Sequence, residues 1–123
     1  MPETSVVLFA EDDFTAPLLE WLDGLPEKAQ DKCIAKIERL AALGHELRRP
    51  DADFLRDGIY GLRVSMQGVQ FRILYFFFGK PAVLSHGFIK KGDKVPLKEI
   101  DHALVRKQKF IKDSKRHTYQ GEF

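Results

Sequence analysis

Basic side chains interrupt three strand-like apolar runs in the second half of the chain. Arg63 and Arg72 each stand within such a run, while His86, Lys90 and Lys91 belong to the third. Because side chains alternate between the two faces of a strand, Arg63, Arg72 and the Lys90/Lys91 end can converge on one sheet face. Guanidinium groups grip phosphate oxygens in pairs and ammonium groups add point charges, so the pattern indicates phosphodiester binding. The residues alone favour the other interpretation, in which these charges are salt-bridge partners on a solvated face.

The remaining reactive side chains predict no further chemistry. His86 is either a proton carrier or a hydrogen-bonded core histidine, since apolar residues flank it. The other histidines show no metal-ligand spacing, so we infer no metal and no cofactor. Cys33 is the single cysteine of the chain, which excludes an internal disulfide and a zinc site built from cysteines.

Composition and charge limit the class of protein. The chain has 123 residues, 44% of them hydrophobic, which suits one folded domain. The longest apolar run, residues 73–78, is far shorter than the ~20 residues that span a bilayer, so we expect a soluble, cytoplasmic protein without membrane contact. Residues 1–31 carry eight acids and one base, a net charge of −7, and the remainder carries +9. Such a basic block is a common footprint of polyanion binding.

The hydrophobic period predicts the elements that position these residues. A short β-branched and aromatic run over residues 6–9 predicts a first strand. The period is then helical up to residue 54 and strand-like after it, and a last helix opens at Pro96. The predicted order is β-α-α-β-β-β-α, an α+β fold with a helical hairpin packed on one face of a small, mainly antiparallel sheet. The other sheet face is left free for a site. We expect a single domain over residues 1–112 and a polar, frayed tail over residues 113–123.

Several segments resemble the RelE/ParE toxin superfamily in its phage-derived, HigB-like branch. The similarity covers nearly the whole chain and is most specific in the strand around Arg72 and in the His-Gly-Phe-x-Lys-Lys strand. The segments concerned are residues 25–44, 55–63, 71–77, 86–91 and 96–100.

The resemblance implies the toxin of a type II toxin–antitoxin system with a RelE-like fold. Its reaction would be metal-independent cleavage of mRNA on the ribosome, in which a ribose 2′-OH attacks the adjacent phosphate and leaves a 2′,3′-cyclic phosphate. Its partners would be mRNA, the ribosome and a cognate antitoxin with a helix-turn-helix.

The resemblance also implies roles for individual residues. Arg72 falls at the phosphate-stabilising arginine, Arg63 near a catalytic strand position, and Lys91 at the later basic position. His86 is the candidate proton carrier. Lys90 and Lys94 are expected to bind RNA.

Two departures leave proton transfer unassigned. Gly61 stands where the family usually has an acidic residue, and the C-terminal tyrosine of RelE proper has no clear counterpart. Two alternatives therefore stay open: a ParE-like gyrase inhibitor, and a non-catalytic module that binds nucleic acid or a regulator.

Overall fold

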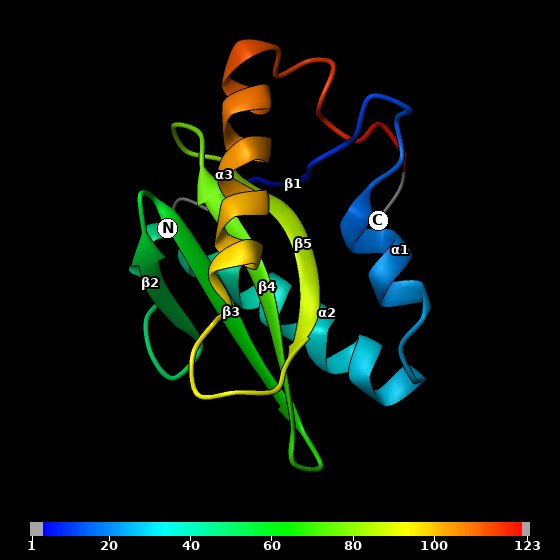
Figure 1. Cartoon of the computed structure of the whole chain (residues 1–123), viewed down its shortest axis with the longest axis vertical. Helices are drawn as coiled ribbons and strands as arrows, with labels where there is room; N and C mark the ends of the chain where they lie inside the picture. The colour runs from blue at the N-terminus through cyan, green and yellow to red at the C-terminus, as the bar shows by residue number, and fades with distance from the viewer. Residues whose placement is uncertain (1–3, 122–123) are drawn as a thin grey trace.

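A computed structural model of the chain describes residues 4–121, in which a five-stranded sheet has helices on both faces (Figure 1). The strand order is β1-β5-β4-β3-β2, with β1 parallel to β5 and the other neighbours antiparallel. The predicted α+β fold is therefore confirmed. The elements are β1 (Val6–Leu8), α1 (Pro17–Asp23), α2 (Glu27–Leu43), the 3-10 turn η1 (Gly44–Glu46), β2 (Ala52–Arg56), β3 (Ile59–Met66), β4 (Val69–Phe77), β5 (Ala82–Lys90) and α3 (Leu97–Lys112).

Two tight turns fix the register of the antiparallel strands. The pairs Asp57-Gly58 and Gln67-Gly68 all have positive φ, the conformation of type I′ hairpin turns. The second turn places Arg63 directly opposite Arg72 in the β3–β4 pair. The hairpin that sequence alternation predicts is thus present, and it brings the two arginines together.

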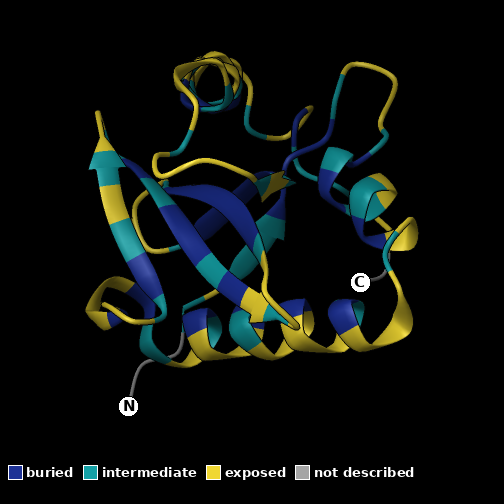
Figure 2. Ribbon diagram, turned by 60° about the horizontal axis from the view of Figure 1, so that its bottom comes forward, coloured by how far each residue is buried: buried dark blue, intermediate teal, exposed yellow. Residues whose placement is uncertain are grey.

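The helical hairpin α1–α2 covers one face of the sheet, as predicted. From α2 the buried side chains are Ala29, Cys33, Ile37 and Leu40, while its outer face is exposed (Figure 2). Helix α1 crosses β5 so closely that a Cβ at Gly87 would lie 2.3 Å from the ring of Trp21. This close approach explains a glycine inside a strand.

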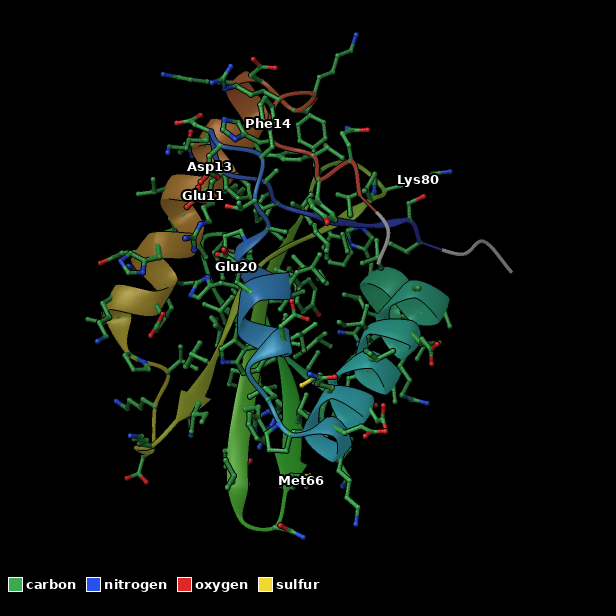
Figure 3. All side chains as sticks on the ribbon, turned by 90° about the vertical axis from the view of Figure 1, so that its right-hand side faces the viewer. Glu11, Asp13, Phe14, Glu20, Met66 and Lys80 are labelled. Carbon is green, nitrogen blue, oxygen red and sulfur yellow. The ribbon has the colours of Figure 1, made fainter. Side chains whose placement is uncertain are left out.

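The second sheet face is not free, contrary to our expectation, because α3 crosses it (Figures 1 and 3). The apolar side of α3 packs on the α3-facing side chains of β3, β4 and β5 around Leu74 and Phe76. The residues of α3 that are buried in this packing are Ile100, Ala103 and Phe110. The end of the sheet that carries Arg63 and Arg72 lies beyond this packing and borders an open pocket.

Two further differences concern the strands. Residues 52–56 form an extra strand, β2, because the Asp57-Gly58 turn pairs them with β3. A bulge in β5 inserts Ser85 as an extra residue opposite no residue of β4. Leu84 therefore pairs with Tyr75, and His86 pairs with the next residue of β4, Leu74. Leu84 therefore faces the helical hairpin and His86 faces α3, whereas simple alternation had placed both on one face.

The expectation of a frayed tail is wrong for residues 113–121. Their backbone folds back along the start of the chain, where Ala10 N donates to His117 O and Tyr119 N donates to Leu8 O. His117 is buried, and its Nδ1 lies 2.7 Å from the carbonyl oxygen of Ala10. Residues 122–123 lie outside the described part, and the boundary at residue 112 stays a prediction.

None of the helices within residues 4–121 combines the length and the apolar character that a bilayer crossing needs.

Candidate nucleic-acid interface

Four of the predicted site residues line one open pocket of about 420 Å³ on the α3 side of the sheet. They come from three strands and a loop: Arg63 from β3, Arg72 from β4, Lys90 from β5, and Lys94 from the segment before α3. We call this site the basic pocket. Arg49 and Arg56 also line it.

Arg72 is the most unusual residue of the basic pocket because it is a buried cation without an acidic partner in the described part of the chain. The residue is 4% exposed, and the hydrogen bond that its side chain forms within residues 4–121 runs from Nη1 to the carbonyl oxygen of Phe71, at 2.9 Å. Among residues 4–121, no fully buried side-chain N or O atom lacks a hydrogen-bond partner. The other guanidinium nitrogens of Arg72 have no such partner, so they are accessible and open onto the pocket that Arg72 lines. No salt bridge joins it to a carboxylate of the described residues. Such an unpaired buried charge is costly to a fold unless an anion binds there.

A second cation increases that cost. Arg63 lies directly opposite Arg72 across the β3–β4 ladder, and like charges in that position repel. Burial, and next the charge of Arg63, lower the pKa of the Arg72 guanidinium, while the charge of Asp53 acts in the opposite direction. Arg72 nevertheless stays charged at neutral pH, because the pKa of a guanidinium lies far above neutrality. An incoming phosphate would relieve the repulsion.

Asp53 is a functional candidate that sequence reasoning missed. Its Oδ2 lies 3.3 Å from Arg63 Nη1, and its Oδ1 forms an ion pair with Arg49. It is the residue of β2 that pairs with Gly61 of β3. Its carboxylate therefore lies beside the strand position at which Gly61 carries no side chain. The sequence carries little signal for it, because residues 52–56 (Ala-Asp-Phe-Leu-Arg) do not alternate regularly between apolar and polar residues, and only the Asp57-Gly58 pair that follows is typical of a hairpin turn.

The three lysines differ in their placement. Lys90 Nζ donates to the carbonyl oxygen of Gly92 at 2.9 Å, which holds its charge at the end of β5. Lys94 is exposed at the rim of the basic pocket. Lys91 is exposed next to Lys90 but does not line the basic pocket. Lys91 can therefore add to the positive electrostatic potential around the pocket more readily than it can contact a ligand inside it.

His86 lies away from the basic pocket, under α3. Arginine can only donate, so the 3.1 Å contact from Arg106 Nη1 makes His86 Nδ1 an acceptor. The proton then sits on Nε2 and is donated to Glu99 Oε1 at 2.9 Å. Burial lowers the pKa of His86, although the hydrogen bond to Glu99 opposes this shift. Its surroundings match the core-histidine interpretation.

Apolar residues also line the basic pocket. Leu55, Val95 and Ile100 pack on the α3-side core, and the side chain of Leu97 is largely exposed. Asp93 adds a carboxylate to the lining. A nucleotide has a charged phosphate and a flat apolar base, so a pocket lined by both cationic and apolar side chains suits one.

A larger groove of about 530 Å³ between α1 and α2 has the opposite character. Its charged lining residues, Asp23 and Glu38, are acidic, and the rest are polar or apolar. This groove repels a phosphate backbone, which leaves the basic pocket as the better nucleic-acid site.

Sequence comparison identifies the family of the chain. The profile of the family described as Phage derived protein Gp49-like (DUF891) matches residues 20–108, which run from α1 into α3. The chain therefore belongs to the Gp49-like family, a RelE-like family associated with the toxins of toxin–antitoxin systems. Membership of a toxin family implies an antitoxin as partner. None of the curated proteins matches the chain.

Proposed function

We propose that this protein is a HigB-like toxin of a type II toxin–antitoxin system and cleaves mRNA on the ribosome without a metal ion. The observation that carries the proposal is Arg72, a buried guanidinium that has no carboxylate partner among residues 4–121 and faces Arg63 across the sheet. A buried cation without such a partner, next to a second cation at a pocket, favours the binding of an anion.

The proposed reaction is an internal transesterification. The 2′-oxygen of a ribose forms a bond to the adjacent phosphorus, and the bond from phosphorus to the 5′-oxygen breaks. The products are a 2′,3′-cyclic phosphate and a free 5′-hydroxyl. Negative charge gathers on the phosphoryl oxygens in the transition state, where the fixed donors of Arg72 and Arg63 stabilise it.

Proton transfer needs a base for the 2′-hydroxyl and an acid for the leaving oxygen. Arginine is a poor base because its guanidinium keeps its proton far above neutral pH. Asp53 is the better candidate base, since its carboxylate lines the basic pocket beside Arg63. His86 is less suited, because it lies under α3 and does not line the basic pocket.

We further propose that a helix-turn-helix antitoxin inhibits the protein by covering the basic pocket. Its contacts would be acidic side chains or a C-terminal carboxylate, because charge complementarity speeds association. The pair of changes Lys90→Glu and Lys91→Glu should slow binding. The control pair Lys112→Glu and Lys115→Glu makes the same change in charge beyond the pocket and should leave the rate nearly unchanged. Equal rates for the two pairs would place the antitoxin elsewhere.

The test of activity is to map the 5′ ends of cellular mRNA after a short pulse of expression, with and without translation. We expect new ends within translated codons, their loss when translation is blocked, and their absence with Arg72→Met. Arg39→Met makes the same chemical change on α2, outside the basic pocket, and should preserve the ends. Intact mRNA together with inhibited DNA gyrase would replace the proposal with the ParE-like alternative. Intact mRNA without an effect on gyrase would favour a binding module.

A further inference from the structure

A second cluster of chemistry-bearing side chains lies beside α3, outside the basic pocket. It consists of His86 from β5 together with Glu99 and His102 from α3. Glu99 and His102 are three residues apart, so they project from neighbouring turns of the same helix face. The bulge at Ser85 turns His86 toward them. Two imidazoles and one carboxylate therefore converge from two elements.

The spacing of these groups suits a metal ion. One ligand atom from each residue lies within 4.8 Å of the other two, and His86 Nε2 is 2.9 Å from Glu99 Oε1. Around a tetrahedral Zn²⁺ with bonds of about 2.0–2.1 Å, neighbouring ligand atoms are roughly 3.3 Å apart. The spacing between His86 and Glu99 is close to that value and the upper limit of 4.8 Å exceeds it by about 1.5 Å, so small side-chain movements would close the site.

We propose that His86, Glu99 and His102 bind a divalent transition-metal ion, with Zn²⁺ as the best match to the ligand set. Two histidines and a glutamate are a known protein ligand set for Zn²⁺, and a fourth position is commonly filled by water. Here that position can open toward the solvent, because His102 borders a surface hollow of about 170 Å³.

The neighbours of His86 can support this role. When Nε2 binds the ion, the ring proton moves to Nδ1 and is donated to Ser85 Oγ, which lies 2.8 Å away. A metal-bound histidine usually donates its second nitrogen in this manner. Arg106 then loses its acceptor on Nδ1 and keeps Glu11, whose Oε2 is 3.3 Å from Arg106 Nη2. Figure 3 shows Glu11 reaching toward α3 from the loop before α1.

The site is separate from the basic pocket. At 100° per residue, Glu99, His102 and Arg106 lie on one flank of α3, and the pocket-lining Leu97 lies on the opposite flank. The ion would join β5 to α3 and so fix the helix that borders the basic pocket. Its role would be structural, because it does not reach the pocket that we propose for RNA.

Binding can be measured without any assay of RNA cleavage. The full chain, free of a polyhistidine tag and treated with a chelator, is titrated with Co²⁺ and followed by visible absorption, and with Zn²⁺ by calorimetry. We expect one ion per chain, absorption bands of nitrogen- and oxygen-ligated Co²⁺, and loss of these bands when Zn²⁺ is added.

Variants separate this site from adventitious binding. His102→Ala removes an exposed ligand and leaves the core intact. It should weaken Zn²⁺ binding at least tenfold, because even the loss of a residue that only hydrogen-bonds a metal ligand typically costs about tenfold in affinity. Glu99→Gln should weaken it as well. Arg106→Gln should strengthen it, because the cation no longer competes for Nδ1. His45→Gln, an exposed histidine in η1, is the matched control and should bind as the wild type does.

Two results would overturn the proposal. One is the absence of Co²⁺ bands and of stoichiometric Zn²⁺ binding in the folded wild-type protein. The other is binding that survives in His102→Ala and Glu99→Gln at wild-type strength, which would place the ion elsewhere. Neither result bears on the basic pocket, since cleavage of RNA is not measured.

Discussion

Arg72→Met should preserve or increase the stability of the protein while it strongly slows RNA cleavage. A buried residue that only supports the fold would show the opposite, because its loss destabilises. Methionine has a similar length, fills the apolar β4 environment and carries no charge. The two readouts therefore separate a functional arginine from a structural one.

The size of the stability change follows from the contacts of Arg72. Replacing buried ionic groups by apolar side chains of similar volume is often neutral or stabilises by about 1–4 kcal/mol. Loss of the hydrogen bond from Nη1 to Phe71 offsets about 1 kcal/mol of this. The net change therefore lies between a loss of about 1 kcal/mol and a gain of about 3 kcal/mol. At roughly 4 °C per kcal/mol for a domain of this size, Tm would rise by up to about 12 °C.

The size of the activity change follows from the proposed chemistry. Loss of one preorganised donor to a transition-state oxyanion costs about 2.7–4 kcal/mol, and we allow about 2–4 kcal/mol here. This corresponds to a fall of about 30- to 900-fold in the cleavage rate. Arg72→Lys should recover only part of it, because an ammonium keeps the charge and loses the paired donors. Ribosome binding should fall much less, since many basic contacts share that task.

The assay combines urea unfolding with cleavage of ribosome-bound mRNA for the wild type and each variant. Arg106→Met is the control for stability, because Arg106 has a carboxylate partner in Glu11 and its loss should destabilise. The reasoning is refuted if Arg72→Met loses more than about 1 kcal/mol of stability. It is also refuted if folded Arg72→Met cleaves RNA at the wild-type rate.

Three further predictions concern the fold. Burial raises the pKa of Cys33 to about 11, so its thiolate fraction at pH 8 is roughly a hundredfold below that of a free thiol. A disulfide reagent should therefore label Cys33 at the rate of a free thiol only when the protein is unfolded in urea. The pKa of Asp51 is lowered, mainly by the hydrogen bond from Lys36. The carboxylate therefore stabilises the folded state above pH ~4, and this stabilisation is lost as the pH falls through the folded pKa. Between pH 7 and pH 3 the urea midpoint of Asp51→Asn should fall less than that of the wild type. Gly87→Ala should cost about 1–3 kcal/mol in urea unfolding because its Cβ meets the α1 tryptophan, whereas Gly92→Ala, with nothing within 4 Å, should be near neutral.

Local rules explain why much of the fold and of the basic pocket could be predicted from the sequence. The Gln67-Gly68 pair specifies a two-residue turn, and such a turn fixes the register of its strands. Alternation then assigns the face of each side chain, which is why Arg63 and Arg72 meet as expected. The same rule keeps Lys90 on their face, since it pairs with Gln70 of β4.

The features that were missed depend on contacts between distant segments. Simple alternation cannot reveal the Ser85 bulge, which reverses the face of His86 relative to Leu84. The burial of His117 depends on the backbone of Ala10, more than a hundred residues earlier in the chain. Asp53 becomes relevant only once β2 pairs with β3, so its place beside Arg63 has no local signature.

The most direct test of the central claim is the chemistry of the cut. Purified protein is added to ribosomes programmed with an mRNA that carries a single 2′-deoxynucleotide at the mapped site, and with the all-ribose mRNA as its control. If the basic pocket supports attack by the ribose 2′-hydroxyl, the all-ribose mRNA yields a 2′,3′-cyclic phosphate and a 5′-hydroxyl. The deoxy-substituted mRNA then stays bound but uncut at that position. Cleavage of the deoxy-substituted mRNA at the same bond would contradict the account.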